Sequence, residues 1–335
     1  MKRVLFVSRD YNARNDGGSA VAKRNLAFLK ALGLQVAELT IGVPSLAVRL
    51  KNVLLRESYG DRRSLSKQLK YHFSQPYDFV FFDGSHYGVY LREFARHGFK
   101  TICFFHNVEV DYYQQKYKTT HQPQDKLMVG FIAHNERCCI DHASYLITLN
   151  ERDNRQLQKR YHRGADFILP TSFDAYDAAE HHDPVKLPEQ YLLFVGTNFF
   201  ANKEAMDYYI KEIAPSVHIP LLVVGNIAEA FQDATATPNV HFLGRVDDLA
   251  PYYLQATAVV APILSGSGLK TKTVEALRYG KYVIGSAEAF EGISILNYPG
   301  AGCECHNTSD YISLINSLKV AKTNEASLRL FDEQF

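Results

Sequence analysis

The stretch PILSGSGLKTKTVEALRYGKYVIG, residues 262–285, decides the fold of this chain. It follows an apolar run at residues 258–261 that is typical of a buried strand. Its small residues at 266–268 predict a loop, residues 269–279 predict a helix, and residues 282–285 predict a second strand. The order strand, glycine-rich loop, helix and strand is typical of a parallel sheet with helices packed on it.

The predicted helix suits an anion at its first turn. Its N-terminal N–H groups lack intrahelical partners, and the helix dipole makes this end positive. Lys270 and Lys272 add positive charge, and Glu275 lies on the same helix face as Thr271 and Lys272. This pattern favours a nucleotide, with the diphosphate at the helix end and the ribose hydroxyls on Glu275. An ordinary amphipathic surface helix would give the same pattern.

The run GSGLKTKTVEALRYGKYVIGS resembles the donor-site signature of retaining glycosyltransferases of family 4. In that family two glutamates, eight positions apart, frame the sugar nucleotide. Glu275 matches the second of them, whereas Ser267 stands at the position of the first. The spacing of the glycines, the basic residues and Glu275 is most similar to a bacterial branch that makes polysaccharides and other glycans. The resemblance implies the GT-B fold, in which two Rossmann-like domains face each other across a cleft.

Length and composition allow this fold. The 335 residues are enough for two domains, and the net charge of +1 gives no argument for nucleic-acid binding. No apolar run reaches the roughly 20 residues of a membrane span. The N-terminal run MKRVLFVSRD predicts a first strand, not a signal peptide. Five cysteines, an odd number, fit a reducing cytoplasm, and Cys303, Cys305 and His306 match no zinc-binding pattern. We therefore expect a cytoplasmic protein without a metal.

Short apolar runs alternate with helical patterns along the whole chain, which predicts an α/β protein with two doubly wound sheets. The first half has predicted strands at residues 4–8, 36–41, 79–83, 101–105, 145–149 and 167–169 and predicted helices at 19–32, 87–97, 125–142 and 151–161. The second half has predicted strands at residues 191–196, 221–225, 240–243, 258–261, 282–285 and 302–305 and predicted helices at 202–213, 246–255, 269–279 and 309–320.

The polar, proline-containing residues 171–188 are the expected linker between these halves. We expect an N-terminal acceptor domain at residues 1–170 and a C-terminal donor domain at 189–320. The tail, 321–335, is expected to pack back on the N-terminal domain.

Two groups in the first domain are candidates for ligand contact. Gly17, Gly18 and Ser19 follow the first strand, where glycines let a ligand approach the backbone. Their spacing is not that of a dinucleotide-binding fingerprint. The resemblance implies that this loop faces the donor phosphates, although a flexible connection would also explain it. His106 follows a predicted strand, and the resemblance places it near the transferred sugar. Glu136 matches a glutamate of the bacterial branch, but a helix-surface charge is equally compatible.

The second domain holds the remaining candidates for donor binding. Many family members clamp the diphosphate with an arginine and a lysine after the first strand of this domain, where the present chain offers Lys203 alone. The diphosphate is therefore assigned to Lys270 and Lys272. Arg245 and Val246 match the family's loop beside the nucleotide base. The other expected donor contacts are Gly196, Thr197, Asn198, Ser265, Gly266, Ser267, Gly268, Leu269 and Thr271.

Residues 49–70 are strongly basic and contain interspersed leucines and valines. Two acids, Glu57 and Asp61, stand against seven basic residues, so that the segment carries a charge of +5. Its basic residues are Arg49, Lys51, Arg56, Arg62, Arg63, Lys67 and Lys70. Such a pattern suits an anionic membrane surface or a lipid diphosphate acceptor, and a solvated helix face would also explain it. Peripheral contact with the inner membrane face is therefore one expectation.

Taken together, these patterns predict a retaining glycosyltransferase. It would move a sugar from a UDP- or GDP-linked donor to a glycan, a lipid-linked acceptor or a protein, with no cofactor and no metal. Two alternatives stay open at this stage. One is a sugar-nucleotide epimerase of the same fold, and the other is a non-catalytic partner of a transferase, to which Ser267 in place of glutamate would point.

Overall fold

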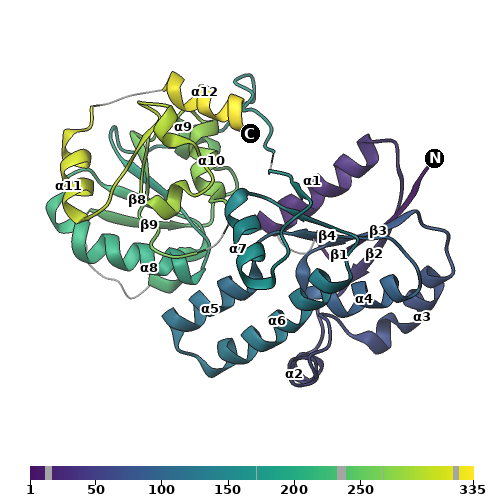
Figure 1. The fold of residues 1–335 in the computed structure, drawn as a ribbon. Helices are drawn as coiled ribbons and strands as arrows, with labels where there is room; N and C mark the ends of the chain where they lie inside the picture. Colours follow the sequence, from purple (N-terminus) through teal and green to yellow (C-terminus); the bar gives the residue numbers. More distant parts are fainter. Residues whose placement is uncertain (12–16, 171, 232–238, 267, 320–323) are drawn as a thin grey trace. The chain divides into compact units, whose positions relative to one another are not determined.

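The computed structural model describes residues 1–11, 17–170, 172–231, 239–266, 268–319 and 324–335. The chain divides into two compact units, Met1–Ser172 (unit 1) and Phe173–Phe335 (unit 2). Each unit contains a six-stranded sheet in which all described neighbours run parallel (Figure 1). This is the two-domain α/β architecture of the GT-B fold, as predicted. That the two domains face each other across a cleft stays a prediction.

The sheet of unit 1 has the strand order β2-β1-β3-β4-β5-β6. Its strands are β1 (Arg3–Arg9), β2 (Gln35–Ile41), β3 (Phe79–Asp83), β4 (Thr101–Phe105), β5 (Tyr145–Thr148) and β6 (Phe167–Ile168). The strand order reverses between β1 and β3, because β2 lies on one side of β1 and β3 to β6 lie on the other. In such sheets, ligands bind beyond the carboxyl ends of the strands near the point of reversal.

Both faces of this sheet are buried, because successive side chains of a strand point to opposite faces. Val4 and Phe6 of β1 join one apolar cluster with residues of α1, whereas Leu5 and Val7 join another with residues of α3, α4 and α6. Figure 1 shows α1 on one side of the sheet and α3 and α4 on the other. The helices of unit 1 are α1 (Gly17–Ala31), α2 (Leu46–Leu55), α3 (Arg62–Phe73), α4 (Gly88–Arg96), α5 (Glu109–Thr120), α6 (Pro123–His142) and α7 (Glu151–Tyr161).

Unit 2 repeats the plan with the strand order β12-β11-β10-β7-β8-β9. Its strands are β7 (Leu192–Val195), β8 (Leu221–Val224), β9 (Val240–Gly244), β10 (Ala258–Ala261), β11 (Val283–Gly285) and β12 (Gly302–Glu304). Its α-helices are α8 (Phe200–Tyr208), α9 (Ala250–Gln255), α10 (Thr271–Arg278), α11 (Thr308–Ser317) and α12 (Glu325–Gln334). A π-helical turn, Tyr209–Ile213, continues α8 to the end of the predicted helix.

Residues 173–188 of the expected linker belong to unit 2. Phe173 and Leu187 pack against the core of this unit, and the Tyr176 ring lies 4.9 Å from that of Tyr279. His182 Nδ1 lies 2.7 Å from Asp248 Oδ2. Apolar and aromatic side chains spaced along a polar sequence therefore hold this segment against unit 2.

The described part of the C-terminal tail, residues 324–335, packs on unit 2. Helix α12 buries Leu330 and Phe331 in the core of unit 2. The Ser327 hydroxyl donates to the carbonyl oxygens of Lys281 and Ala301, at 3.0 and 3.2 Å. These contacts tie the tail to the residues just before β11 and β12 of unit 2.

Candidate functional site

The helix predicted to hold an anion is α10, and its first turn lacks the side-chain cap that α3 and α7 have. Helices α3 and α7 are capped by Asp61 and Asn150, whose side chains accept hydrogen bonds from N–H groups of the first turn. The N-cap of α10 is Lys270, and an ammonium group has no acceptor. This helix end therefore presents donors and positive charge together.

The two lysines at this end have different surroundings. The Lys270 ammonium donates to Glu288 Oε1 at 2.7 Å and to the Gly268 carbonyl oxygen at 2.8 Å. Lys272 donates to Asn202 Oδ1, and its ammonium lies 4.1 Å from the centre of the Phe194 ring. Burial of Lys272, together with the charge of Lys270, lowers the pKa of Lys272 to about 7.

Glu275 lies one turn further along α10 and is half-buried. Its Oε2 accepts a hydrogen bond of 3.1 Å from the hydroxyl of Tyr253, whose ring stacks on that of Tyr279. Burial raises the pKa of this carboxyl, and the Tyr253 hydrogen bond opposes the rise. The tyrosine fixes one carboxylate oxygen, so the orientation of Glu275 is set before any ligand binds.

The loop before α10 needs glycine. Gly266 has a φ of +141°, which residues with a side chain rarely adopt, and a Cβ there would lie 3.4 Å from Lys270 Cε. The Ser265 hydroxyl donates to Glu204 of α8. The loop therefore passes beside α8 and the Lys270 side chain.

The carboxyl ends of β7 and β8 approach each other closely. Gly225 has a φ of +115°, and a Cβ there would lie 2.1 Å from the carbonyl oxygen of Gly196. Asn202 Nδ2 donates to the Thr197 carbonyl oxygen at 2.9 Å, so the amide that accepts from Lys272 also holds the loop after β7. Asn198 N–H donates to Asn226 Oδ1 at 2.9 Å.

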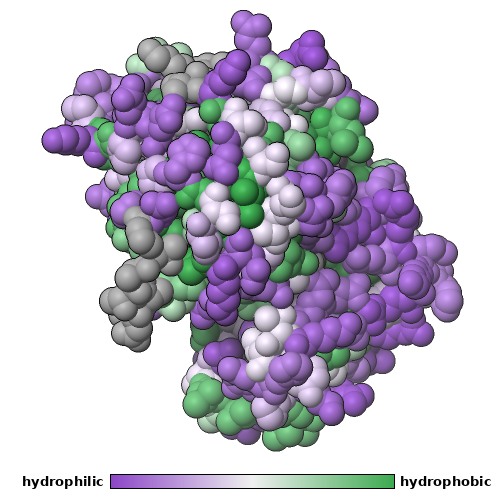
Figure 2. Space-filling view, turned by 90° about the vertical axis from the view of Figure 1, so that its left-hand side faces the viewer, coloured by the Kyte–Doolittle hydropathy of each residue, from purple (hydrophilic) through white to green (hydrophobic). Residues whose placement is uncertain are grey.

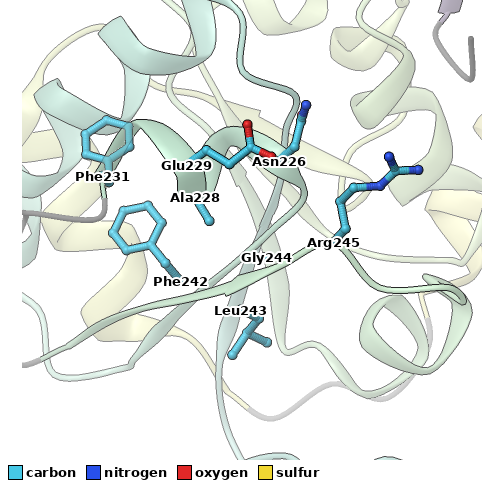
Figure 3. Close-up of a pocket in the computed structure, with 8 residues that line it drawn as sticks. All are labelled: Asn226, Ala228, Glu229, Phe231, Phe242, Leu243, Gly244 and Arg245. Carbon is cyan, nitrogen blue, oxygen red and sulfur yellow. The ribbon is translucent and has the colours of Figure 1, made fainter.

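Asn226 belongs to a pocket of about 540 Å³ at the carboxyl end of β9. Its lining residues are Asn226, Ala228, Glu229, Phe231, Phe242, Leu243, Gly244 and Arg245. The rings of Phe231 and Phe242 stack with centroids 5.1 Å apart. Figure 3 shows these rings at one end of the pocket and the polar side chains of Asn226, Glu229 and Arg245 at the other. The pocket offers a flat apolar wall and polar groups, which suit a heteroaromatic ring.

Unit 1 has a polar cluster at the carboxyl ends of β3 and β4. His106 Nε2 lies 3.1 Å from Asp83 Oδ2, and Asn25 Nδ2 donates to Asp83 Oδ1 at 2.7 Å. Burial alone would lower the pKa of His106, but the charge of Asp83 and its contact with the ring outweigh burial and raise it. Arg24 donates to Asn25 Oδ1 at 2.6 Å, which extends the cluster to α1.

Residues 189–316 match the family described as "Glycosyl transferases group 1". The matched residues lie within unit 2. The matched residues include α10, its preceding loop, the loop after β7 and the pocket. No curated protein matches the chain.

Solved structures of glycosyltransferases share the fold of the whole chain. HepE of Anabaena, solved in complex with UDP-glucose, has a TM-score of 0.64 at 14% identity, over 100% of this chain and 96% of that one. WaaG, described as a glycosyltransferase involved in lipopolysaccharide biosynthesis, has a TM-score of 0.60 at 18% identity, over 99% and 92%. WaaB, a lipopolysaccharide outer core galactosyltransferase, has a TM-score of 0.62 at 11% identity, over 99% and 95%.

In unit 2, contacts bring several predicted residues together. Lys272 and Thr197 share the Asn202 amide, and Asn198 contacts Asn226 beside Arg245. Other predicted residues lie elsewhere in unit 2. Thr271 is exposed at the start of α10, Lys203 is exposed on α8, and Leu269 and Val246 pack against the core. Ser267 lies outside the described residues.

In unit 1, Gly17 and Gly18 begin α1 directly, and Ser19 is buried in its first turn, where its hydroxyl accepts from Arg9 at 3.3 Å. Glu136 is fully buried, not a surface charge. It accepts from the hydroxyl of Tyr161 at 2.7 Å and from Val110 N–H at 3.3 Å. Burial raises the pKa of Glu136 to about 8. These bonds fix α6 against α7 and the start of α5.

Sequence reasoning missed the partners that orient the predicted residues. Asn202, Glu288 and Tyr253 come from other elements of unit 2, and no local spacing indicates them. Asp83 could have been found, because it ends a buried strand next to the strand that precedes His106. Polar residues at neighbouring carboxyl ends of a parallel sheet are expected to meet.

Among the residues that the structure describes, no group of three or more His, Cys, Asp or Glu side chains could hold a metal ion. Within the same residues, no helix combines the length and hydropathy needed to span a bilayer.

Proposed function

We propose that this protein is a retaining glycosyltransferase that moves a sugar from a nucleotide sugar to a glycan, lipid-linked or protein acceptor. One observation carries the proposal. A short helix in the matched region places Lys270, Lys272 and Glu275 on its first two turns, beside an end rich in N–H donors. These groups complement the diphosphate and the ribose of a sugar nucleotide.

The lysines would act mainly on the leaving group. As the bond between the sugar and the diphosphate breaks, negative charge grows on the phosphate oxygens. Lys270, Lys272 and the N-terminus of α10 would stabilise this charge from fixed positions. Because two ammonium groups supply the positive charge, we propose that transfer needs no metal ion.

The remaining groups would orient the donor. Glu275, held by Tyr253, would accept hydrogen bonds from the ribose hydroxyls. The pocket beside Arg245 would take the base. HepE was solved with UDP-glucose, and its likeness to this chain makes UDP the first nucleotide to test. His106, held by Asp83, would contact the transferred sugar.

Retention of configuration would follow from attack on the same face of the sugar that the diphosphate leaves. In that geometry the leaving phosphate oxygen can take the proton of the acceptor hydroxyl. No side chain is then required as a general base, and the proposal names none.

Isothermal calorimetry with a panel of UDP-, GDP- and dTDP-sugars tests donor binding, and release of the free nucleotide tests turnover. We expect one donor to bind and to be slowly hydrolysed without an acceptor. Lys272→Ala should reduce hydrolysis more than binding, because the charge that it meets grows in the transition state. Failure of every nucleotide sugar to bind would contradict the proposal. Nuclear magnetic resonance of the product's anomeric proton then tests retention separately.

A further inference from the structure

Helix α2 of unit 1 exposes its leucines and buries its asparagine. Leu46, Leu50 and Leu54 have exposed fractions of 70%, 57% and 72%, whereas Asn52 is 4% exposed. The spacing of four residues places the three leucines along one stripe of the helix. A helix that packs on a protein core normally turns its leucines inward. The outward stripe therefore indicates that something other than this chain covers the leucines.

The orientation of α2 is fixed by its inner face. Asn52 Nδ2 donates to the carbonyl oxygens of Ser58 and Gly60, at 3.0 and 2.7 Å. Val53 packs against the apolar cluster formed by residues of α5 and α6. The Ser45 side chain caps the start of the helix. Rotation of α2 to bury the leucines would break these contacts.

Positive charge surrounds the leucine stripe. At about 100° per residue, Arg49 and Lys51 fall on opposite sides of the stripe, and both are exposed. On α3, the next helix, Arg63, Lys67 and Lys70 form a second exposed row at spacings of four and three. Two of the basic residues are paired with carboxylates: Arg62 pairs with Glu93 of α4, and Lys51 Nζ lies 3.5 Å from Glu57 Oε1.

The exposed large apolar residues of α2 are Leu46, Leu50, Leu54 and Leu55. Figure 1 places α2 at the lower edge of unit 1, away from the sheet. Figure 2 shows hydrophobic side chains gathered at the bottom of its view.

We propose that α2 is an in-plane membrane anchor. Its leucine stripe enters the boundary between headgroups and acyl chains of an anionic bilayer, and the basic residues of α2 and α3 contact the headgroups. An apolar stripe flanked by cations matches such a surface in both chemistry and charge. A second copy of the chain matches it poorly, because two segments of charge +5 would then meet. The inference does not depend on the sugar donor.

The chain contains no tryptophan, which allows a direct test of insertion. Leu50→Trp places a single indole in the stripe, and Leu296→Trp places one at an exposed leucine of unit 2. With vesicles of phosphatidylcholine and phosphatidylglycerol, we expect a blue shift and quenching by brominated acyl chains for Leu50→Trp alone. Equal fluorescence responses of the two variants, or no blue shift for Leu50→Trp, would overturn the proposal.

Vesicle sedimentation tests how much the leucines and the basic residues contribute to membrane binding. Leu50→Gln/Leu54→Gln should weaken binding to anionic vesicles by about 100-fold or more, since each buried leucine contributes on the order of tenfold or more. The matched control, Leu32→Gln/Leu296→Gln, removes two equally exposed leucines and should bind as the wild type does. Arg63→Gln/Lys67→Gln/Lys70→Gln should weaken binding by about fivefold per residue at low salt.

Two results would refute the anchor. One is unchanged vesicle binding by the Leu50/Leu54 variant. The other is a wild-type dimer in solution that this variant abolishes, because the stripe would then be a contact between copies. Calorimetry with a nucleotide sugar separates this proposal from the donor site, since all the α2 and α3 variants should retain donor affinity.

Discussion

The protonation of Lys272 should control the affinity for the donor. Burial and the charge of Lys270 lower the pKa of Lys272 to about 7 in the free protein. A bound diphosphate brings negative charge to this ammonium and raises its pKa again. Donor binding should therefore take up a proton at neutral and alkaline pH, and affinity should fall as pH rises.

The size of the effect follows from the charged fraction of Lys272. If only the charged form binds, the apparent dissociation constant equals the intrinsic constant divided by that fraction. The fraction is about one half at pH 7 and about one eleventh at pH 8 for a pKa of about 7. Affinity should thus weaken roughly tenfold between pH 6 and pH 8 and roughly 90-fold between pH 6 and pH 9.

Calorimetry with UDP-glucose, or with whichever nucleotide sugar the panel selects, measures this dependence. A nucleotide sugar is preferable to the free diphosphate, because its phosphates are esterified at both ends and keep a constant charge over this range. Titrations in two buffers with different ionisation enthalpies give the proton uptake, which should approach one at pH 8 and zero at pH 6.

Two variants serve as controls. Lys272→Arg keeps its charge throughout, and its affinity should not change with pH. Lys281 also has a lowered pKa, of about 8, but its ammonium donates to the Leu254 carbonyl oxygen at 2.7 Å, so Lys281→Met should keep the wild-type dependence. A wild-type affinity that is constant from pH 6 to pH 9 would show that Lys272 does not meet the diphosphate.

Three further predictions concern other groups. Glu275→Gln should weaken donor binding by roughly 10- to 150-fold with an almost unchanged melting temperature, since hydrogen bonds to a charged acceptor contribute about 1.5–3 kcal/mol. Normal binding together with early unfolding would instead make Glu275 structural. Transfer measured in excess EDTA should equal that without it, and activity lost with EDTA and restored by manganese would contradict metal independence. Asp83→Asn should lower the pKa of His106, measured by nuclear magnetic resonance, because burial is then unopposed. An unchanged His106 pKa would contradict the pairing.

The strands could be predicted because most of them are continuous apolar runs in buried parallel sheets. The predicted strands lie within one or two residues of the observed ones. Helix α9 begins four residues later than predicted, where the Asp248 carboxylate accepts from Ala250 N–H at 2.9 Å. Helix α5 was missed because its tyrosines and polar residues give no apolar stripe. Composition does not show that Phe173 and Tyr176 of the expected linker pack against unit 2.

The candidate site was predictable where its chemistry is local. Lys270, Lys272 and Glu275 lie within six positions, so helical spacing alone places them on neighbouring turns. Their partners come from elements up to 70 residues away, as with Asn202 and Lys272. Such contacts depend on the topology of the sheet, which brings α8 beside α10. The orientation of the Glu275 carboxylate also depends on Tyr253, a residue that no motif singles out.

The partners of the two lysines explain why Lys272 is the sharper probe. Lys270 faces a carboxylate, Glu288, at 2.7 Å, so a diphosphate arriving there meets a cation whose charge is already balanced. Lys272 donates to a neutral amide and lies over an aromatic ring, and neither group brings a full negative charge. A dianionic ligand therefore changes the electrostatic environment of Lys272 more than that of Lys270. Burial and the charge of Lys270 keep the pKa of Lys272 low, and the charge of Glu275 opposes this shift only in part. Among the described residues, an incoming anion therefore meets no competing direct carboxylate partner at Lys272, whereas at Lys270 it competes with Glu288.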